Sequence, residues 1–281
     1  MRVIYQFPPG YTMCVDDERF DVVERDEWRG GEHASAADAV AREEPLEIRI
    51  GGVPVAVVMR TPGHDEELVR GFLVTERIVD RAADVASVRH CVDADEDNVM
   101  QAVLVHGVGV DLARLRRNLY ASSSCGVCGK TSIAAAMGVA PPLADDLRVA
   151  ADVLYALPAR LRQAQEVFGR TGGLHAAGLF DERGEPLAVR EDVGRHNAVD
   201  KIVGWASVAG HLPLARRILF VSGRVSFEIV QKALAARVPI VAAVSAPSSL
   251  AVEAARTGGM TIVGFVRGER MCVYAGAQRV I

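Results

Sequence analysis

Short apolar runs separated by helical stretches fill the second half of this chain, and they limit its possible folds more than any other feature. Runs that are apolar on both faces and alternate with helices are typical of a sheet covered by helices on both sides. The sequence therefore predicts an α/β fold with a mixed sheet in a domain at 141–281. Its expected strands lie at 174–180, 186–193, 217–221, 240–244, 261–266 and 271–274, and its helices at 195–209, 227–236 and 248–256, after two helical pieces at 149–168 separated at Pro158.

The first half of the chain predicts a small β-rich lobe at 45–120, preceded by an N-terminal arm at 1–44. With 281 residues, half of them hydrophobic, the chain can bury a sizeable core and fits two domains better than one. The arm is rich in charge and glycine and has little periodicity, so we expect it to be extended or poorly ordered. Within the lobe we expect strands at 46–50, 53–57, 85–92 and 98–105, a turn at Gly51-Gly52, and a helix at 66–78 that Asp65 caps.

Residues 121–140 form a cysteine loop followed by a short helix. Cys125 and Cys128 stand two residues apart in the string A-S-S-S-C-G-V-C-G-K, where serine and glycine remove bulk on both sides. Neither sulfur is therefore expected to be packed as a core hydrophobe. Lys130, three upstream arginines and the N-terminus of the following helix favour the thiolate form. The segment predicts exposed thiol chemistry.

This cysteine pair has three other interpretations. A structural zinc site usually needs four ligands, and Cys14, Cys91 and Cys272 are isolated, so zinc would require distant histidines or a second chain. A thioredoxin-like pair should follow the first strand of an α/β unit, but 111–120 looks helical. Both interpretations stay open. A phosphate-binding P-loop is discarded, because Ser124 stands where its first glycine is required.

Polar residues gather where the expected strands of the second half end. Because α/β proteins place ligands at such ends, four neighbouring turns indicate a pocket. The last hairpin adds two arginines around a glycine, suited to phosphate or a purine edge, although a charged hairpin tip explains them equally well. The turns are 172–175 with His175, 191–197 with Asp192 and His196, 222–224 with Arg224, and 245–249, and the hairpin spans 264–270.

Charge and cysteine usage narrow the class of protein. A net charge of −4 speaks against non-specific nucleic-acid binding, although local basic clusters could hold a small anion. No apolar run is long enough to cross a membrane, and no secretory signal pattern opens the chain. Five irregularly spaced cysteines fit a reducing compartment. We therefore expect a cytoplasmic protein.

Four of these motifs, in this order, resemble the formate dehydrogenase accessory sulfurtransferase family, often labelled FdhD. The similarity runs from about residue 45 to the C-terminus and leaves the arm uncovered. The strings that carry it are S-S-S-C-G-V-C-G at 122–129, T-G-G-L-H-A-A at 171–177, E-D-V-G-R-H-N at 191–197 and S-G-R-V-S at 222–226.

The resemblance implies a sulfur carrier. Such a protein takes persulfide sulfur from a cysteine desulfurase and delivers it to the molybdenum or tungsten bis-guanine-dinucleotide cofactor of formate dehydrogenase. It implies that Cys125 bears the persulfide and Cys128 is the partner thiol. It also implies a homodimer, no permanently bound metal, and a cofactor-binding segment made of Phe265, Val266, Arg267, Gly268, Glu269 and Arg270, in which Val266 and Glu269 depart from the family pattern.

Two rival classes follow from the same resemblance, which implies a cytidine-deaminase-like fold for the larger domain. Zinc deaminases need H-x-E and a downstream P-C-x-x-C, but Ala177 stands where the glutamate is needed and no cysteine pair follows. Deamination is therefore excluded. A cofactor-binding chaperone without sulfur chemistry would need the pocket and the arginines but not the cysteines. Replacing both cysteines separates that class from a carrier.

Overall fold

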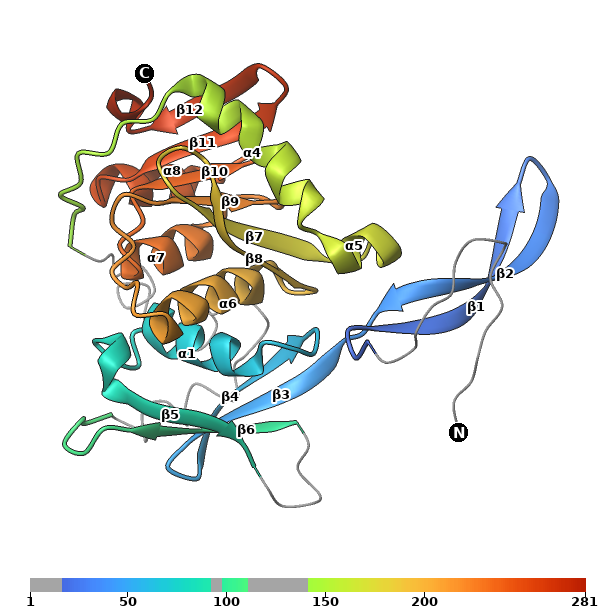
Figure 1. The fold of residues 1–281 in the computed structure, drawn as a ribbon, viewed down its shortest axis with the longest axis horizontal. Coiled ribbons are helices and arrows are strands. Elements are labelled where there is room, and N and C mark those ends of the chain that lie inside the picture. Colours follow the sequence, from blue (N-terminus) through green and yellow to red (C-terminus); the bar gives the residue numbers. More distant parts are fainter. Residues whose placement is uncertain (1–16, 92–97, 111–140) are drawn as a thin grey trace.

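The computed structural model describes residues 17–91, 98–110 and 141–281, which fold into two sheets with helices between them and a long hairpin that projects from the body (Figure 1). Cys125, Cys128 and the helix expected after them lie outside the described residues. Among the described residues, no helix has the length and apolar character that crossing a membrane requires.

The larger sheet is mixed and has six strands, as the sequence predicts. Its order is β12-β11-β10-β9-β7-β8, with β9, β10 and β11 parallel and the outer strands antiparallel to their neighbours. The predicted strand positions are confirmed to within one or two residues. The strands are β7 (His175–Phe180), β8 (Pro186–Asp192), β9 (Ile218–Val221), β10 (Ile240–Ala243), β11 (Thr261–Arg267) and β12 (Arg270–Ala275).

Helices cover both faces of this sheet. In β9, Leu219 and Val221 join the core on one face, whereas Ile218 and Phe220 join a second core that contains the leucines of α4. This alternation follows from the period of two in a strand and explains why the strands are apolar throughout. The helices are α6 (Arg195–Val208), α7 (Phe227–Ala235) and α8 (Ser249–Thr257) on the first face and α4 (Ala151–Gln163) on the second, followed by α5 (Glu166–Thr171).

The predicted break at Pro158 is wrong, because Pro158 lies inside α4 and the helix ends only at Gln163. A proline in a helix interior costs about 3 kcal/mol. Leu154, Leu157 and Leu161 of the same helix are fully buried against the sheet. Each buried leucine contributes roughly 2 kcal/mol, so packing outweighs the local penalty.

The smaller sheet has four strands in the order β4-β3-β6-β5, and a helix covers its inner face. The apolar residues of this lobe belong to the same continuous core as α6 and α7, so the two parts of the chain are packed as one body. These elements lie near their predicted positions, but β4 continues to Arg60, the helix ends at Thr75 rather than at 78, and His64 rather than Asp65 is its cap. They are β3 (Glu44–Ile50), β4 (Val53–Arg60), α1 (Asp65–Thr75), β5 (Val85–His90) and β6 (Val99–Leu104).

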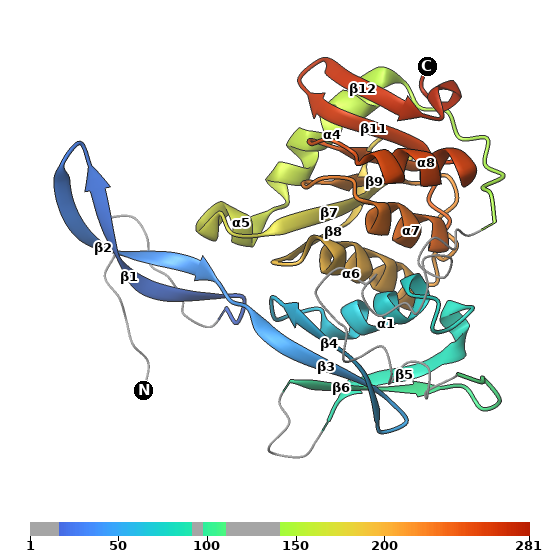
Figure 2. The same ribbon diagram turned by 180° about the vertical axis from the view of Figure 1, so that it is seen from behind.

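The two parts meet where α1 crosses α6, with a glycine on each helix at the crossing (Figures 1 and 2). A Cβ atom at Gly71 would lie 1.8 Å from the backbone oxygen of Asp200, and one at Gly204 would lie 1.7 Å from that of Glu67. Backbone therefore touches backbone, which no larger residue permits. Beside the crossing, Lys232 of α7 donates hydrogen bonds to Asp200 at 2.9 and 3.0 Å.

Residues of the predicted arm form a long two-stranded hairpin, β1 (Phe20–Arg29) and β2 (Glu32–Ala41), rather than an arm without regular structure. Gly30 and Gly31 have φ angles of 59° and 93° and make its turn, so they connect strands instead of breaking them. At the root, Phe20 and Ala39 pack against Val167 and Leu174. Beyond the root the hairpin stands clear of the body (Figures 1 and 2).

Candidate functional site

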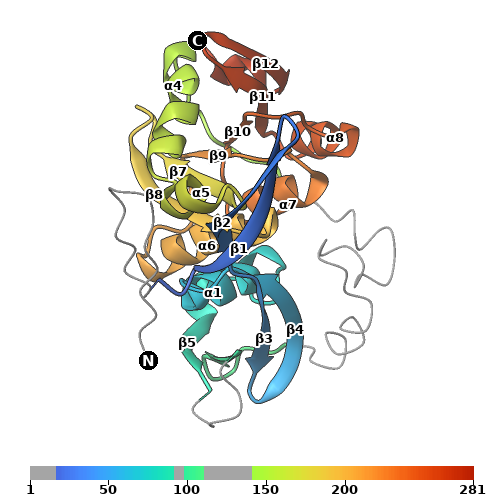
Figure 3. The ribbon, with the colours of Figure 1, turned by 90° about the vertical axis from the view of Figure 1, so that its right-hand side faces the viewer.

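The predicted polar turns come together at one end of the larger sheet, where the carboxyl ends of its parallel strands lie. The parallel strands β9, β10 and β11 all end there, β7 begins there at His175, and His175 pairs with Asp192 at the end of β8. Figure 3 looks onto this side of the molecule. We call this the carboxyl edge. It brings 172–175, 191–197, 222–224 and 245–249 into one region, as the sequence predicts for an α/β sheet.

Cationic and neutral nitrogen groups meet around Gly223 on this edge. A Cβ atom at Gly223 would lie 3.4 Å from Nδ1 of His175 and 3.8 Å from Cδ of Arg195, so both side chains flank the glycine. The Nε atom of Arg195 is buried and has no hydrogen-bond partner among the described residues. An unpaired buried guanidinium nitrogen is costly unless a ligand completes it.

His175 lies within reach of two positive charges on this edge, those of Arg195 and Arg224. Burial lowers the pKa of His175 from its ordinary value, and Arg195 lowers it further, while Asp192 opposes them and Arg224 adds to the lowering. The imidazole is therefore neutral near pH 7. Burial is the larger cause, but the charges of Arg195 and Arg224 also act at His175, and these charges attract an anion.

A second group of polar side chains stands at the start of α6 and α7. His196 Nε2 lies 3.3 Å from the hydroxyl of Ser226 and 3.9 Å from a carboxylate oxygen of Glu228. On the neighbouring strand end, the hydroxyl of Ser222 accepts a hydrogen bond of 2.9 Å from the backbone N–H of Ala176. The Ser222 hydroxyl thus ties the start of β7 to the end of β9, and the Ser226 hydroxyl contacts the start of α6.

The predicted cofactor-binding segment forms the tip of the β11–β12 hairpin. Phe265 has a φ angle of 54°, sits in a bulge of β11 and exposes 36% of its surface. A bulge of this kind re-aims a side chain out of the sheet. Arg267 and Arg270 pair across the tip, and Gly268 and Glu269 between them are exposed.

Val266 departs from the predicted segment, because its side chain is fully buried in the core beneath α4. Residues next to each other in a strand point to opposite faces, so an outward Phe265 requires an inward Val266. The side chain of Val266 is therefore not part of an exposed binding surface. Glu269 stays exposed at the tip.

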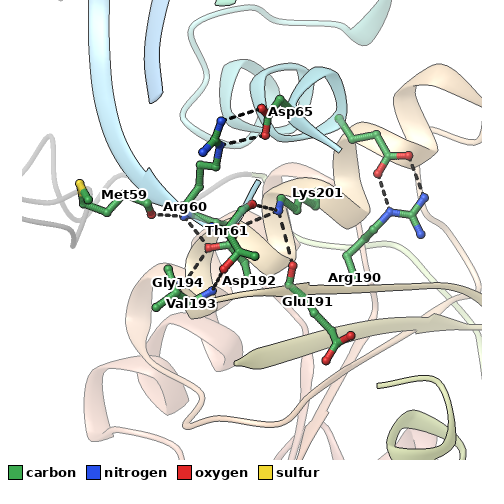
Figure 4. Close-up of polar contacts among 12 residues, drawn as sticks. Met59, Arg60, Thr61, Asp65, Arg190, Glu191, Asp192, Val193, Gly194 and Lys201 are labelled. Atoms are coloured by element: carbon green, nitrogen blue, oxygen red, sulfur yellow. Dashed lines mark hydrogen bonds and ion pairs between the residues drawn. The ribbon is translucent and has the colours of Figure 1, made fainter. Parts of the chain in front are cut away.

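Asp192 has a structural role rather than an open place on the edge. Its side chain is fully buried, and its carboxylate accepts hydrogen bonds from backbone N–H groups of Thr61 at 3.2 Å and Gly194 at 2.8 Å (Figure 4). Asn197 Nδ2 adds a bond of 2.9 Å, and Lys201 Nζ lies 2.8 Å away. The carboxylate thus fixes the start of α6, and with it Arg195 and His196, to the loop after β4.

Two further ion pairs near Asp192 were not predicted from the sequence: Arg60 with Asp65 inside the smaller part of the chain, and Arg190 with Glu67 between the two parts (Figure 4). Arg60 is 3% exposed, and its guanidinium donates to Asp65 at 3.1 and 3.0 Å and to Glu44 at 2.9 Å. Arg190 of β8 pairs with Glu67 of α1. Arg190 and Glu67 are 123 positions apart, so no local pattern marks their pairing.

A separate pocket of about 460 Å³ lies beside the outer edge of β8, at the root of the hairpin. Its charged and polar lining comes from Arg19, Thr61, His64, Glu166, Arg190 and Glu191. Two of the predicted turns reach it, 172–175 through Leu174 and 191–197 through Glu191. Among the residues that the structure describes, no cluster of three or more metal-ligating side chains is present.

The fold is that of an α/β protein whose parallel strands end at an edge that carries His175, Arg195 and Arg224. A model of the FdhD/NarQ family matches residues 41–281, and the chain belongs to this family. The likeness of the larger domain to cytidine deaminases stays a prediction.

Two named relatives align with the sequence of this chain over nearly their whole length. A "Sulfur carrier protein FdhD" from Mycolicibacterium paratuberculosis is 51% identical over 261 residues, covering 88% of this chain and 96% of its own. One of the same name from Streptomyces coelicolor is 52% identical over 260 residues, covering 90% and 92%. A solved structure from Desulfotalea psychrophila, of a protein described as a candidate formate dehydrogenase accessory protein, has a TM-score of 0.74 at 21% identity and covers 93% of this chain and 99% of its own, which supports the fold.

Proposed function

We propose that this protein is a sulfur carrier that serves a formate dehydrogenase. The observation that carries the proposal is the identity of about one half to relatives named sulfur carrier proteins, over nearly the full length of both chains. Cys125 accepts the sulfur, and Cys128 is its partner thiol. This chain has both cysteines in a Ser/Gly-rich setting that suits an accessible, reactive thiol.

The sulfur transfer is an exchange between thiolates. The Cys125 thiolate attacks the outer sulfur of a persulfide on a cysteine desulfurase, a new S–S bond forms on Cys125, and the donor cysteine leaves as a thiolate. In the release step, Cys128 attacks the inner sulfur of the Cys125 persulfide. That step expels hydrosulfide and leaves a Cys125–Cys128 disulfide, which a cellular thiol reductant must reopen. The cytoplasm supplies such reductants.

The acceptor in this proposal is the bis-guanine-dinucleotide molybdenum or tungsten cofactor, handled as substrate. Its diphosphates match Arg195, with its unpaired buried Nε, and Arg224, while the exposed ring of Phe265 offers a stacking surface to guanine. Arg267 and Arg270 at the hairpin tip add two guanidinium groups. A homodimer is part of the proposal on the family resemblance alone.

The test compares activation of a formate dehydrogenase apoenzyme by the wild-type protein and by Cys125→Ala. The carrier predicts loss of activation together with unchanged binding of guanosine diphosphate, because the nucleotide groups lie on the carboxyl edge. Full activation by Cys125→Ala refutes the sulfur-carrier function. Cys272→Ala is the matched control, since Cys272 is a half-buried free thiol on β12.

A cofactor-binding chaperone is the second candidate, favoured by one observation: the cationic groups around Gly223 need no cysteine to bind an anion. The double variant Cys125→Ala/Cys128→Ala decides between the two. A chaperone retains full activation of the dehydrogenase in this variant, whereas a sulfur carrier loses it. Cys128→Ala alone separates the roles of the cysteines: it accepts sulfur but delivers it slowly if Cys128 releases it.

A further inference from the structure

The β1–β2 hairpin is much longer than its packing requires. Only its root is buried, through Phe20 and Ala39, whereas nearly all positions from Val23 to Ala37 are exposed. A two-stranded ribbon without a third strand or a packed face is marginally stable at best in water. Alanine makes up half of β2, although it is a poor strand former. A segment of this kind gains stability from something that covers it.

One face of the hairpin continues the buried root outward. Phe20 and Val22 at the root share a face of β1 with Glu24, Asp26 and Trp28, because these positions are two residues apart. We call the outer part, formed by Glu24, Asp26, Trp28, His33, Ser35 and Ala37, the Trp28 face. The Trp28 face thus continues, along the strands, the face by which the root packs against the body.

The Trp28 face carries an aromatic anchor between carboxylates. Trp28 is 73% exposed, and its ring lies 4.9 Å from that of His33, centroid to centroid. His33 Nε2 is 3.1 Å from Asp26, which fixes the pair. Glu24 has no ion-pair partner among the described residues. Tryptophan is the side chain most often found at the energetic centre of protein interfaces, and small neighbours such as Ser35 and Ala37 leave room around it.

Charge decides what kind of molecule this face accepts. The hairpin from Phe20 to Ala41 contains six carboxylates and two arginines, a net charge of −4 that equals the net charge of the whole chain. Two such hairpins side by side would repel one another, so a second copy of the hairpin is a poor occupant. A basic protein surface is complementary and would be drawn to it.

The position of the hairpin indicates which partner it serves. A Cβ atom at Gly173 would lie 3.4 Å from Ala41 at the end of β2, and His175 of the carboxyl edge begins two residues later. Figure 3 shows the hairpin standing in front of this edge. A protein held on the Trp28 face is therefore placed over the groups that bind the cofactor.

We propose that the Trp28 face is a docking surface for a protein with a basic surface, and that this protein is the acceptor of the cofactor, the catalytic subunit of the dehydrogenase. The assignment of the partner rests on the proposed function. The docking surface itself rests on the exposure, charge and place of the hairpin. Binding through it holds the acceptor at the carboxyl edge during delivery.

The test measures the affinity of the purified dehydrogenase apo-subunit for the full chain at low and at physiological salt. Trp28→Ala is expected to weaken binding about thirtyfold, as for an interface hot spot. Glu24→Lys is expected to weaken it about fivefold and to reduce the salt dependence. Glu24 has no partner to lose, so this variant leaves the hairpin intact. Glu253→Lys on α8 makes the same charge change at an exposed site away from the hairpin and should bind like the wild type.

Replacing 23–38 by Asn-Gly joins Val22 to Ala39 by a tight turn, keeps the buried root, and should abolish binding. Sulfur loading of Cys125 by a desulfurase is measured on the same variants. Normal loading with lost binding supports the inference. Unchanged affinity of the shortened chain overturns it while leaving the carrier function standing. A shift from dimer to monomer in the shortened chain, with unchanged affinity for the subunit, overturns it in favour of a second copy as occupant.

Discussion

Replacing Gly204 by alanine tests whether the two parts of the chain are held by direct backbone contact between α1 and α6. The added Cβ atom would lie 1.7 Å from the backbone oxygen of Glu67 and 2.4 Å from its carbonyl carbon. Neither helix can yield by changing a rotamer, because the atom that is met belongs to backbone. Overpacking a core usually costs 1–3 kcal/mol, and a clash with backbone belongs at or above the upper end, so we expect a loss of about 3 kcal/mol or more. For a chain of this size that loss lowers Tm by roughly 6 °C or more.

The assay is urea and thermal unfolding followed by circular dichroism. Gly169→Ala is the matched control: it makes the same change in helix α5, where a Cβ atom would meet nothing within 4 Å. The control should be neutral or stabilise the protein by up to about 1 kcal/mol, because alanine favours helix over glycine. The free energies of unfolding of Gly204→Ala and of the wild type are compared. A difference below about 0.5 kcal/mol, which is near the error of the extrapolation, would refute the close contact between the helices.

Three further outcomes follow from the site. Asp192→Asn leaves the buried ammonium of Lys201 without its counter-ion and should lower the free energy of unfolding in urea by about 3–5 kcal/mol. The double variant Asp192→Asn/Lys201→Met removes the unpaired ammonium and should be more stable than Asp192→Asn; equal or lower stability would contradict this. A bound diphosphate opposes the effects that lower the pKa of His175, so guanosine diphosphate should bind more tightly at about pH 6 than at pH 8, and His175→Asn should flatten that difference in a calorimetric titration. Arg195→Lys keeps the charge but loses the planar fork, and should weaken the same nucleotide about tenfold, whereas equal affinity would remove Arg195 from the site.

The strands of the larger sheet could be placed from the sequence because each is a short apolar run between breakers. β9 and β10 are apolar on both faces since both faces are covered, and the pattern therefore identified their class as well as their position. The predicted helix break at Pro158 is wrong because helix propensity is a local property, whereas the three leucines that hold α4 on the sheet act through tertiary packing.

The hairpin escaped prediction for the opposite reason. β1 and β2 are exposed on both faces beyond their root, so no alternation of apolar and polar residues marks them as strands. The only local signal was Gly30-Gly31, which is a hairpin turn as readily as a break.

The carboxyl edge was predictable as a place, because parallel strands must end together, but the roles of its residues were not. Asp192 looked like an open acid in a polar turn. Its partners include Thr61, which is 131 positions away, and only the folded chain brings that backbone N–H to the carboxylate. The unpaired Nε of Arg195 has no sequence signal either, since it depends on what surrounds the guanidinium in space.

The central claim is that this protein carries sulfur on Cys125. Its most direct measurement is peptide mass spectrometry without reductant, after incubation of the protein with a cysteine desulfurase and cysteine. We expect one added sulfur on the peptide that contains Cys125, absent from Cys125→Ala and retained in Cys272→Ala. If the Cys125 peptide gains no sulfur while guanosine diphosphate still binds, the protein is not a sulfur carrier, and its carboxyl edge belongs to a cofactor chaperone.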